Sequence, residues 1–143
     1  MSLIFKEQSV QFTNSKGIPR IDMPQINQSD ISEFIKWVEV THGIKVRKLF
    51  TEISTLSPTQ CEYNPNSVEQ KKKNVNELLN RMYICDNEGF ILDSHHTYQA
   101  SVETDSDMEV RCYWLECNNS TMLLLSYMFP KSFTKDICNR IIK

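Results

Sequence analysis

The sequence predicts an α+β fold in which helices cover one small mixed sheet within a single domain. First, segments with the apolar spacing typical of helices alternate along the chain with segments that have the period-two pattern typical of strands. Second, a hairpin with a glycine turn lies in the second half of the chain. Third, a length of 143 residues suits one domain that folds without a disulfide or a metal ion. The predicted order is helix, strand, loop, helix, hairpin, short helix, strand, helix, helix.

Residues 1–28 are predicted to form an N-terminal arm packed on the domain that residues 29–143 form. Gly17, Pro19 and Pro24 interrupt any regular periodicity in this segment. Its apolar side chains indicate that it lies against the domain rather than in solvent. They are Ile18, Ile21, Met23 and Ile26.

The first helix is expected to follow Asp30, which can cap it with Glu33 as the capping-box partner. Gly43 is suited to a left-handed helix end. The β-branched, alternating residues 44–53 then predict one or two strands. The buried face of the helix has the spacing i, i+3, i+4, i+7 and consists of Ile31, Phe34, Ile35 and Val38.

The next helix is expected to begin at Asn64, whose side chain can cap it, with Pro65 at the first helical position. The lysine run 71–73 lies toward the polar face and indicates a solvated surface, with an anion-binding patch as the alternative. The apolar face is predicted to consist of Val68, Val75, Leu78, Leu79 and Met82.

The hairpin joins two apolar runs, 83–85 and 90–92, with Gly89 at the position that needs a positive φ. The polar residues after Leu92 lead into a short helix. The acidic stretch 103–109 is expected to be a solvated loop.

Residues 110–115 predict a strand, and Ser120 is expected to cap a helix with its core at 122–128. Pro130 would end that helix. A last short helix is expected to begin at Ser132 or Thr134 and to carry Ile137, Ile141 and Ile142.

The charge balance argues against some partners. The net charge is −2 and the isoelectric point is about 5.9, whereas domains that wrap DNA are usually basic. No apolar run approaches the roughly 20 residues of a membrane span, and the first residues do not have the pattern of a signal peptide. We therefore expect an intracellular, cytoplasmic protein with no membrane partner.

The five cysteines do not suggest a disulfide framework or a zinc site, because their number is odd and no CxxC pair occurs. We expect small buried side chains in a reducing compartment. The cysteines are Cys61, Cys85, Cys112, Cys117 and Cys138.

The junction 92–97 between a strand and a helix is the best candidate for chemistry. A helix N-terminus offers N–H groups without intrahelical partners and favours anions. The hydroxyl groups here could donate to an anion, the imidazoles titrate near neutral pH, and the carboxylate could orient a histidine or act as a base. The alternative is that the acid or the serine only caps the helix while the histidines pack or face water. The side chains are Asp93, Ser94, His95, His96 and Thr97.

The loop 58–64 is the second candidate, because Gln60 and Glu62 can lie on one face of an extended segment just before a helix start. The alternative is an ordinary loop that ends in the capping Asn64. Cys61 could act as a nucleophile only if the fold brought a base beside it. No metal site is expected, since adjacent histidines rarely bind one ion.

Three motifs together resemble the ParB/sulfiredoxin-like domain family, in particular the small stand-alone members that tailed phages carry. The likeness covers about residues 18–138 in order. The motifs are Met23-Pro24-Gln25-Ile26, then Pro58-Thr59-Gln60 with Glu62 and Asn64, then Leu92-Asp93-Ser94-His95-His96.

The resemblance implies a ParB/sulfiredoxin-like mixed sheet with the third motif at a helix N-terminus, where relatives hold nucleotide phosphates. Relatives partition DNA with CTP, reduce sulfinic acids with ATP or phosphorylate free serine, and many phage members are described as ParB-like nuclease domains or inhibitors of the prohead protease. The ligand implied is ATP, ADP or CTP with Mg²⁺, or another anionic small molecule. The partner implied is a phage or host protein in the host cytoplasm.

Roles carried over from the family divide into two groups. The catalytic residues would be Glu62, Asp93 and His95. The ligand-binding residues would be Gln60, Asn64, Ser94, His96 and Thr97.

The chain also departs from the family pattern. Ser94 replaces a glycine, which crowds the approach of a phosphate to the backbone. Thr97 stands where the family usually has a phosphate-binding arginine. The turn lacks the sulfiredoxin cysteine, so reductase chemistry is not expected.

Three functions stay open in this order. The first is a binding protein that keeps an anion or nucleotide pocket and acts through a protein partner. The second is a small-molecule phosphotransferase, with Glu62 as base and His95 or His96 contacting the phosphate. The third is a nuclease or DNA-binding protein, which the acidic isoelectric point disfavours.

Overall fold

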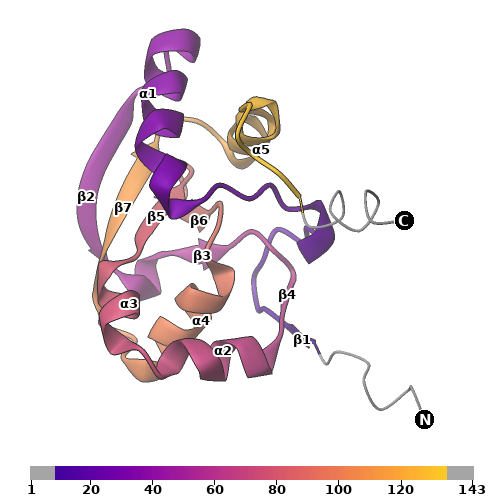
Figure 1. Cartoon of the computed structure of the whole chain (residues 1–143), viewed down its shortest axis with the longest axis vertical. Coiled ribbons are helices and arrows are strands. Elements are labelled where there is room, and N and C mark those ends of the chain that lie inside the picture. The colour runs from indigo at the N-terminus through magenta and orange to yellow at the C-terminus, as the bar shows by residue number, and fades with distance from the viewer. Residues whose placement is uncertain (1–8, 135–143) are drawn as a thin grey trace.

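The computed structural model describes residues 9–134 and has the predicted α+β architecture (Figure 1). In this range the helices are α1 (Ile31–His42), α2 (Pro65–Lys72), α3 (Val75–Asn80), α4 (His95–Thr104) and α5 (Asn119–Met128). The strands are β1 (Val10–Gln11), β2 (Val46–Glu52), β3 (Ser57–Pro58), β4 (Glu62–Tyr63), β5 (Met82–Cys85), β6 (Phe90–Ile91) and β7 (Glu109–Leu115).

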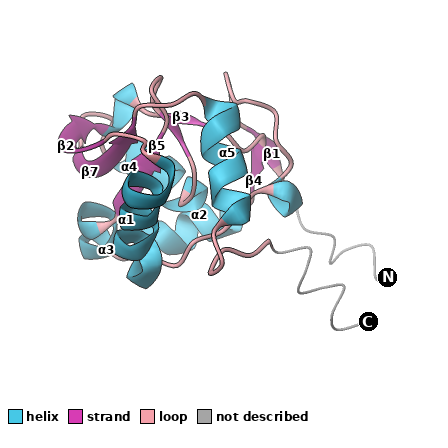
Figure 2. Ribbon diagram, turned by 90° about the horizontal axis from the view of Figure 1, so that it is seen from above, coloured by secondary structure: helices cyan, strands magenta, loops and turns pink. Residues whose placement is uncertain are grey.

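The main sheet is mixed and has the strand order β2-β7-β5-β6-β3. The pairs β5–β7 and β3–β6 are parallel, and the other two pairs are antiparallel. β1 and β4 form a separate antiparallel pair. Figure 2 shows this small pair on the opposite side of the molecule from β2 and β7.

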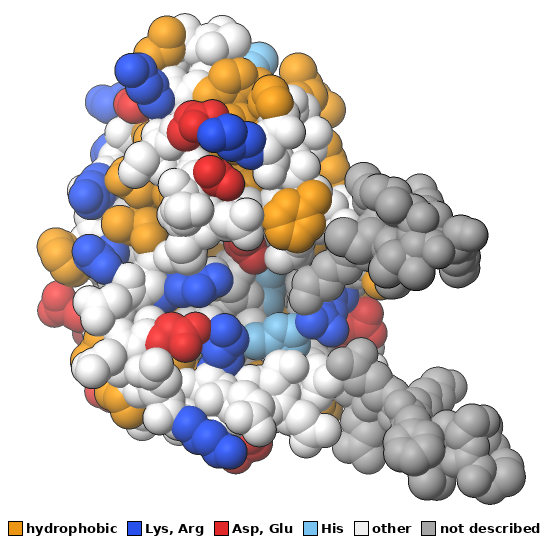
Figure 3. All heavy atoms as spheres, viewed as in Figure 1, with side chains coloured by type: hydrophobic (Ala, Val, Ile, Leu, Met, Phe, Trp, Pro, Cys, Tyr) orange, Lys and Arg blue, Asp and Glu red, His pale blue; other side chains and the backbone are white. Residues whose placement is uncertain are grey.

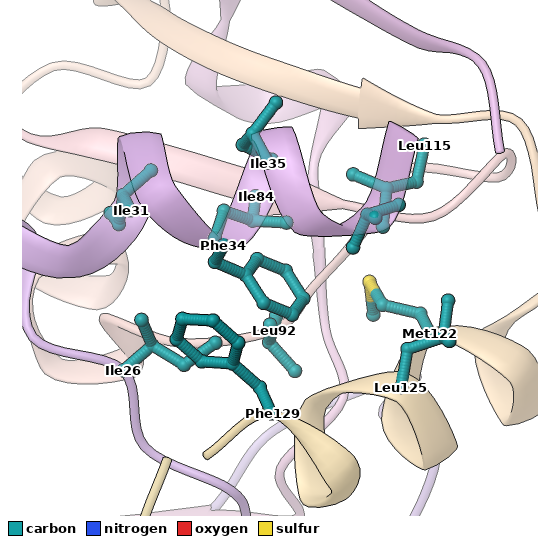
Figure 4. Packing of buried hydrophobic residues seen from close by; sticks show 11 residues of the cluster. Ile26, Ile31, Phe34, Ile35, Ile84, Leu92, Leu115, Met122, Leu125 and Phe129 are labelled. Carbon is teal, nitrogen blue, oxygen red and sulfur yellow. The ribbon is translucent and has the colours of Figure 1, made fainter. Parts of the chain in front are cut away.

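Helices cover both faces of the sheet, and each face has its own core. The pleat of β5 places Ile84 in one core and its neighbours Tyr83 and Cys85 in the other. The first core lies between the sheet, α1 and α5. There Phe34 packs edge-on against Phe129 with ring centroids 5.1 Å apart (Figure 4). The second core lies between the sheet and the helices α2, α3 and α4.

α1 has the predicted apolar face, and its end at Gly43 in a left-handed conformation (φ 66°) is confirmed. The predicted capping box is wrong. Asp30 ends a 3₁₀ turn, so its own backbone is helical and its side chain makes no cap hydrogen bond. The strand expected in residues 44–53 is β2. The buried face consists of Ile31, Phe34, Ile35 and Val38.

The helix start at Asn64 is confirmed, because its side chain accepts a hydrogen bond from the Asn66 backbone N–H. The prediction that one continuous apolar helical face follows this start is wrong. The helix α2 ends at Lys72, with Lys73 as its C-cap. The Asn74 side chain then caps a new helix by accepting a hydrogen bond from the Glu77 N–H. Each short helix buries one apolar side chain, Val68 in α2 and Leu78 in α3. Val75 and Leu79 are 49% and 47% exposed, and Met82 belongs to β5.

The hairpin is confirmed, with Gly89 at φ 87° between β5 and β6. The loop expected at 103–109 is shorter, since α4 extends to Thr104 and β7 begins at Glu109. The cap of α5 is Asn118, which accepts from the Thr121 N–H, and not Ser120. The last predicted helix, with Ile137, Ile141 and Ile142, lies outside the described residues.

The described part of the N-terminal arm contacts the domain at several points. Phe12, Met23 and Ile26 are buried, whereas Ile21 is exposed. β1 pairs with β4, and the backbone of Gln25 forms a bridge with Phe133.

The four cysteines between residues 9 and 134 are free thiols. Cys85 and Cys112 are buried on adjacent strands with their sulfur atoms 3.1 Å apart, and their contact together with burial raises the pKa of Cys85. Cys61 and Cys117 are partly buried, and Cys138 lies outside the described residues. None of the helices described between residues 9 and 134 combines the length and apolar character that a membrane span requires.

Candidate anion-binding site

The turn between β6 and α4 is the meeting point of the three motifs. Strands β3 and β6 run parallel and end side by side, so the loops that follow them leave the sheet at the same end. Residues 59–64 follow one strand and residues 92–97 follow the other. The loops are joined by hydrogen bonds from backbone N–H groups to histidine side chains.

His95 is the central link between the two loops. Its Nε2 accepts hydrogen bonds from the backbone N–H groups of Thr59 and Gln60, both at 3.1 Å. The ring is buried, and burial together with the neighbouring His96 lowers the pKa of His95 to about 3. The imidazole is therefore neutral at pH 7, and its accepting nitrogen is already occupied. Action as a base at this atom would require both hydrogen bonds to break.

His96 makes the second link, since its Nε2 accepts from the Asn64 N–H at 3.0 Å. Asn64 itself caps α2, so this histidine fixes the start of that helix relative to α4. The paired histidines therefore hold two successive parts of the 59–64 loop.

Asp93 ties the first motif to the turn. Its Oδ2 accepts from the Ile26 N–H at 3.2 Å, and its Oδ1 accepts from the Ser94 N–H at 2.6 Å. Both carboxylate oxygens are thus used by the backbone. This bonding holds the N-terminal arm against the start of α4.

Ser94 precedes α4 in a left-handed conformation, with φ 69° and ψ 34°. Its side chain does not cap the helix. Its Oγ instead accepts a hydrogen bond from Arg81 Nε at 2.8 Å. The first N–H groups of a helix have no acceptor within the helix, so the start of α4 carries a partial positive charge.

A cavity of about 170 Å³ lies at this helix start. Figure 3 shows histidine side chains in a hollow of the surface, with lysine and arginine side chains close by. The cavity is lined by Arg20, Gln25, Gln60, Lys71, Arg81, Asp93, Ser94, His95, His96 and Thr97. Six of the eight predicted site residues therefore line it.

Glu62 and Asn64 are the two predicted residues that do not line this cavity. Glu62 belongs to β4, and its carbonyl oxygen accepts from Gln60 Nε2 at 2.6 Å. Asn64 supports the site indirectly: its side chain caps α2, and its backbone N–H donates to His96 Nε2. The second loop thus shapes the site through its backbone and Gln60.

Three cationic side chains line the cavity against the single carboxylate of Asp93. Arg20 follows Pro19 in the arm, Lys71 lies on α2, and Arg81 follows α3. Neither arginine was predicted, because no local sequence pattern connects them with the turn. Lys71 belongs to the run for which an anion-binding patch was the alternative interpretation.

Glu77 on α3 connects two of these cations. Its Oε1 lies 2.9 Å from Lys71 Nζ and 3.9 Å from Arg81 Nη1. Lys72, in contrast, pairs with Glu69 and Glu103, away from the cavity lining. The helical break after Lys73 therefore creates a short segment that positions charge at the site.

A second cavity of about 480 Å³ shares three lining residues with the first, namely Gln25, Arg81 and Asp93. Its other lining residues are Ile26, Asn27, Gln28, Ser29 and Phe133. The wall therefore includes three side-chain amides, one hydroxyl group and one aromatic ring. A ligand held in the small cavity could extend into this larger one.

No group of three or more His, Cys, Asp and Glu side chains within residues 9–134 is arranged to hold a metal ion. Comparison with protein-family models, curated proteins and solved structures found no match to this chain.

Proposed function

We propose that this protein binds a phosphate-bearing small molecule, such as a nucleotide, at the start of α4. The observation that carries the proposal is that three cationic side chains from separate elements line one cavity at an uncapped helix N-terminus. Such a helix end attracts anions, and a guanidinium group matches the geometry of phosphate oxygens. Even with Glu77 beside Lys71 and Arg81, the three cations at the site outnumber the two carboxylates of Asp93 and Glu77, although the net charge of the chain is −2.

The size of the site supports a phosphate group rather than a whole nucleotide in the small cavity. Its volume of about 170 Å³ is below the roughly 300–1,000 Å³ of pockets that hold drug-sized ligands. The remainder of a larger ligand would lie in the adjoining cavity of about 480 Å³. The side-chain amides of this larger cavity could form hydrogen bonds with the polar groups of that remainder.

Binding is better supported than phosphoryl transfer. A transferase needs a base that can reach the attacking hydroxyl group. Glu62 does not line the cavity, His95 Nε2 accepts two N–H groups, and both oxygens of Asp93 accept from the backbone. These contacts support a framework role for the residues that the family resemblance would make catalytic.

Isothermal titration calorimetry tests the proposal with orthophosphate, pyrophosphate, ADP, ATP and CTP, each with and without Mg²⁺. We expect at least one of these anions to bind, with an affinity that falls as salt is added. Lys71→Gln should weaken binding. Lys73→Gln is the matched control, since Lys73 is exposed two residues further on and does not line the cavity. Absence of heat with every probe, or equal effects of the two variants, would overturn the proposal.

A further inference from the structure

Ser94 has a backbone conformation that is unfavourable for its residue type. Only two non-glycine residues between 9 and 134 have a positive φ, Asn14 and Ser94. Asparagine tolerates the left-handed region, whereas serine has no such advantage and glycine adopts it without a steric penalty. A serine here therefore calls for a reason in its side chain.

The Ser94 hydroxyl group contacts Arg81. It accepts a hydrogen bond from Arg81 Nε at 2.8 Å, although 13 residues separate the two in the chain. Glu77 lies 3.9 Å from Nη1 of the same guanidinium group. The Arg81 side chain is only 23% exposed, so the guanidinium group is held from two sides in a partly buried position.

Arg81 also lies where the two cavities meet, because it lines both of them. Thr97, in the first turn of α4, is buried and carries no charge. The guanidinium groups available to an anion in the smaller cavity therefore come from other elements. Arg81 Nε is bonded to Ser94, and the 3.9 Å contact between Nη1 and Glu77 is longer than a hydrogen bond, so the terminal nitrogens still have hydrogen-bonding capacity for a ligand. A guanidinium fork can bind two phosphate oxygens at once.

We infer that Arg81 is the main determinant of affinity for a multidentate phosphate at the site and that Ser94 is its positioning residue, retained in a strained conformation because its hydroxyl group orients the guanidinium. This inference rests on the proposed function. It adds that affinity for a multidentate phosphate depends on one arginine outside the turn. It also assigns the serine a role that glycine, the residue best suited to this backbone, could not fill.

A double-mutant cycle with pyrophosphate as the probe tests this inference. Arg81→Ala should lower the affinity about tenfold or more, the scale of losing a hydrogen bond to a charged group. Arg81→Lys keeps the charge but not the fork, so it should recover only part of that loss. Ser94→Ala should weaken binding in the wild-type background and have little further effect in the Arg81→Ala background. Arg47→Ala is the control and should leave binding unchanged, because Arg47 lies on β2, at the opposite edge of the sheet from β3, and lines neither cavity.

Ser94→Gly separates positioning from folding. It removes the same hydroxyl group as Ser94→Ala but also relieves the backbone strain, so its melting temperature should exceed that of Ser94→Ala. The loss of pyrophosphate affinity should nevertheless match that of Ser94→Ala.

Equal effects of Ser94→Ala in both backgrounds, or full affinity in Ser94→Gly, would refute the inference while wild-type binding upheld the proposed function. If wild-type protein bound neither pyrophosphate nor any other phosphate compound, both would fail together.

Discussion

A hydrogen bond of 3.1 Å joins the Gln60 backbone N–H to the His95 imidazole, although 35 residues separate them in the sequence. The same nitrogen atom accepts from the Thr59 N–H. Thr59 and Gln60 are both buried, so their backbone N–H groups need the imidazole as their hydrogen-bond acceptor. The ring therefore acts as a structural link between two loops, and its protonation state governs that link.

Protonation of His95 is expected to destabilise the fold. Burial lowers its pKa to about 3 from an ordinary value of 6.5, so between these two values the unfolded chain binds a proton that the folded chain does not. The contribution to stability is complete above pH 6.5 and falls as the pH drops toward 3. The slope from this ring is at most about 1.4 kcal/mol per pH unit.

Urea unfolding at a series of pH values from about 7.5 to 4.5 measures this effect. His95→Gln is the control, because its amide oxygen can accept hydrogen bonds but does not titrate. The wild-type protein should lose stability more steeply than the variant as the pH falls. Parallel curves for the two proteins would contradict the assignment.

Phe34→Ala is expected to lower the free energy of unfolding by about 3–5 kcal/mol, because it removes a buried ring from the centre of the first core. The ring packs against Phe129, so the cavity would lie between α1 and α5. Leu124→Ala provides a comparison on α5, since Leu124 is 59% exposed and should cost about 0.5 kcal/mol or less. Chemical denaturation compares the two, and similar losses would show that this core is not the one described.

Gly89→Ala and Gly43→Ala form a matched pair, because both glycines have a positive φ but different surroundings. A Cβ at Gly89 would lie 2.9 Å from the Thr55 carbonyl oxygen, whereas a Cβ at Gly43 would meet nothing within 4 Å. Gly43→Ala should therefore cost only the left-handed strain of about 1–2 kcal/mol. Gly89→Ala should cost more, since the hairpin must also shift. Thermal unfolding measures the order, and a smaller loss for Gly89→Ala would refute the tight packing.

Local patterns were sufficient to predict elements that carry their own signals. The face of α1 repeats with helical spacing and ends at a glycine, and the hairpin places Gly89 between two apolar runs. The Asn64-Pro65 pair predicted the start of α2 for the same reason. In each case the residues that determine the element are near one another in the chain.

The errors arose where neighbouring signals competed. Asn74 ends one helix and caps the next, but the apolar residues on both sides can also be read as a single helical face. Asn118 and Ser120 are both good helix caps, and the structure uses the first. Asp30 could not cap α1, because a preceding 3₁₀ turn had already made its backbone helical.

The candidate site could be predicted only in part. The turn 92–97 and Gln60 were predicted from their motifs, and Gln60 and residues 93–97 line the cavity. Arg20 and Arg81 could not be identified, because each reaches the site through tertiary packing. The electrostatic character of the cavity is therefore a property of the fold.

The parallel pairing of β3 with β6 has a consequence for how such a site could evolve. It brings the two loops together, and backbone hydrogen bonds to Asp93, His95 and His96 then lock the framework. Two of the three cations, Lys71 and Arg81, lie instead on the segment that connects the loops. Substitution in that connecting segment would change the charge of the cavity while leaving these framework hydrogen bonds intact, so the anion preference that we propose could change through few mutational steps.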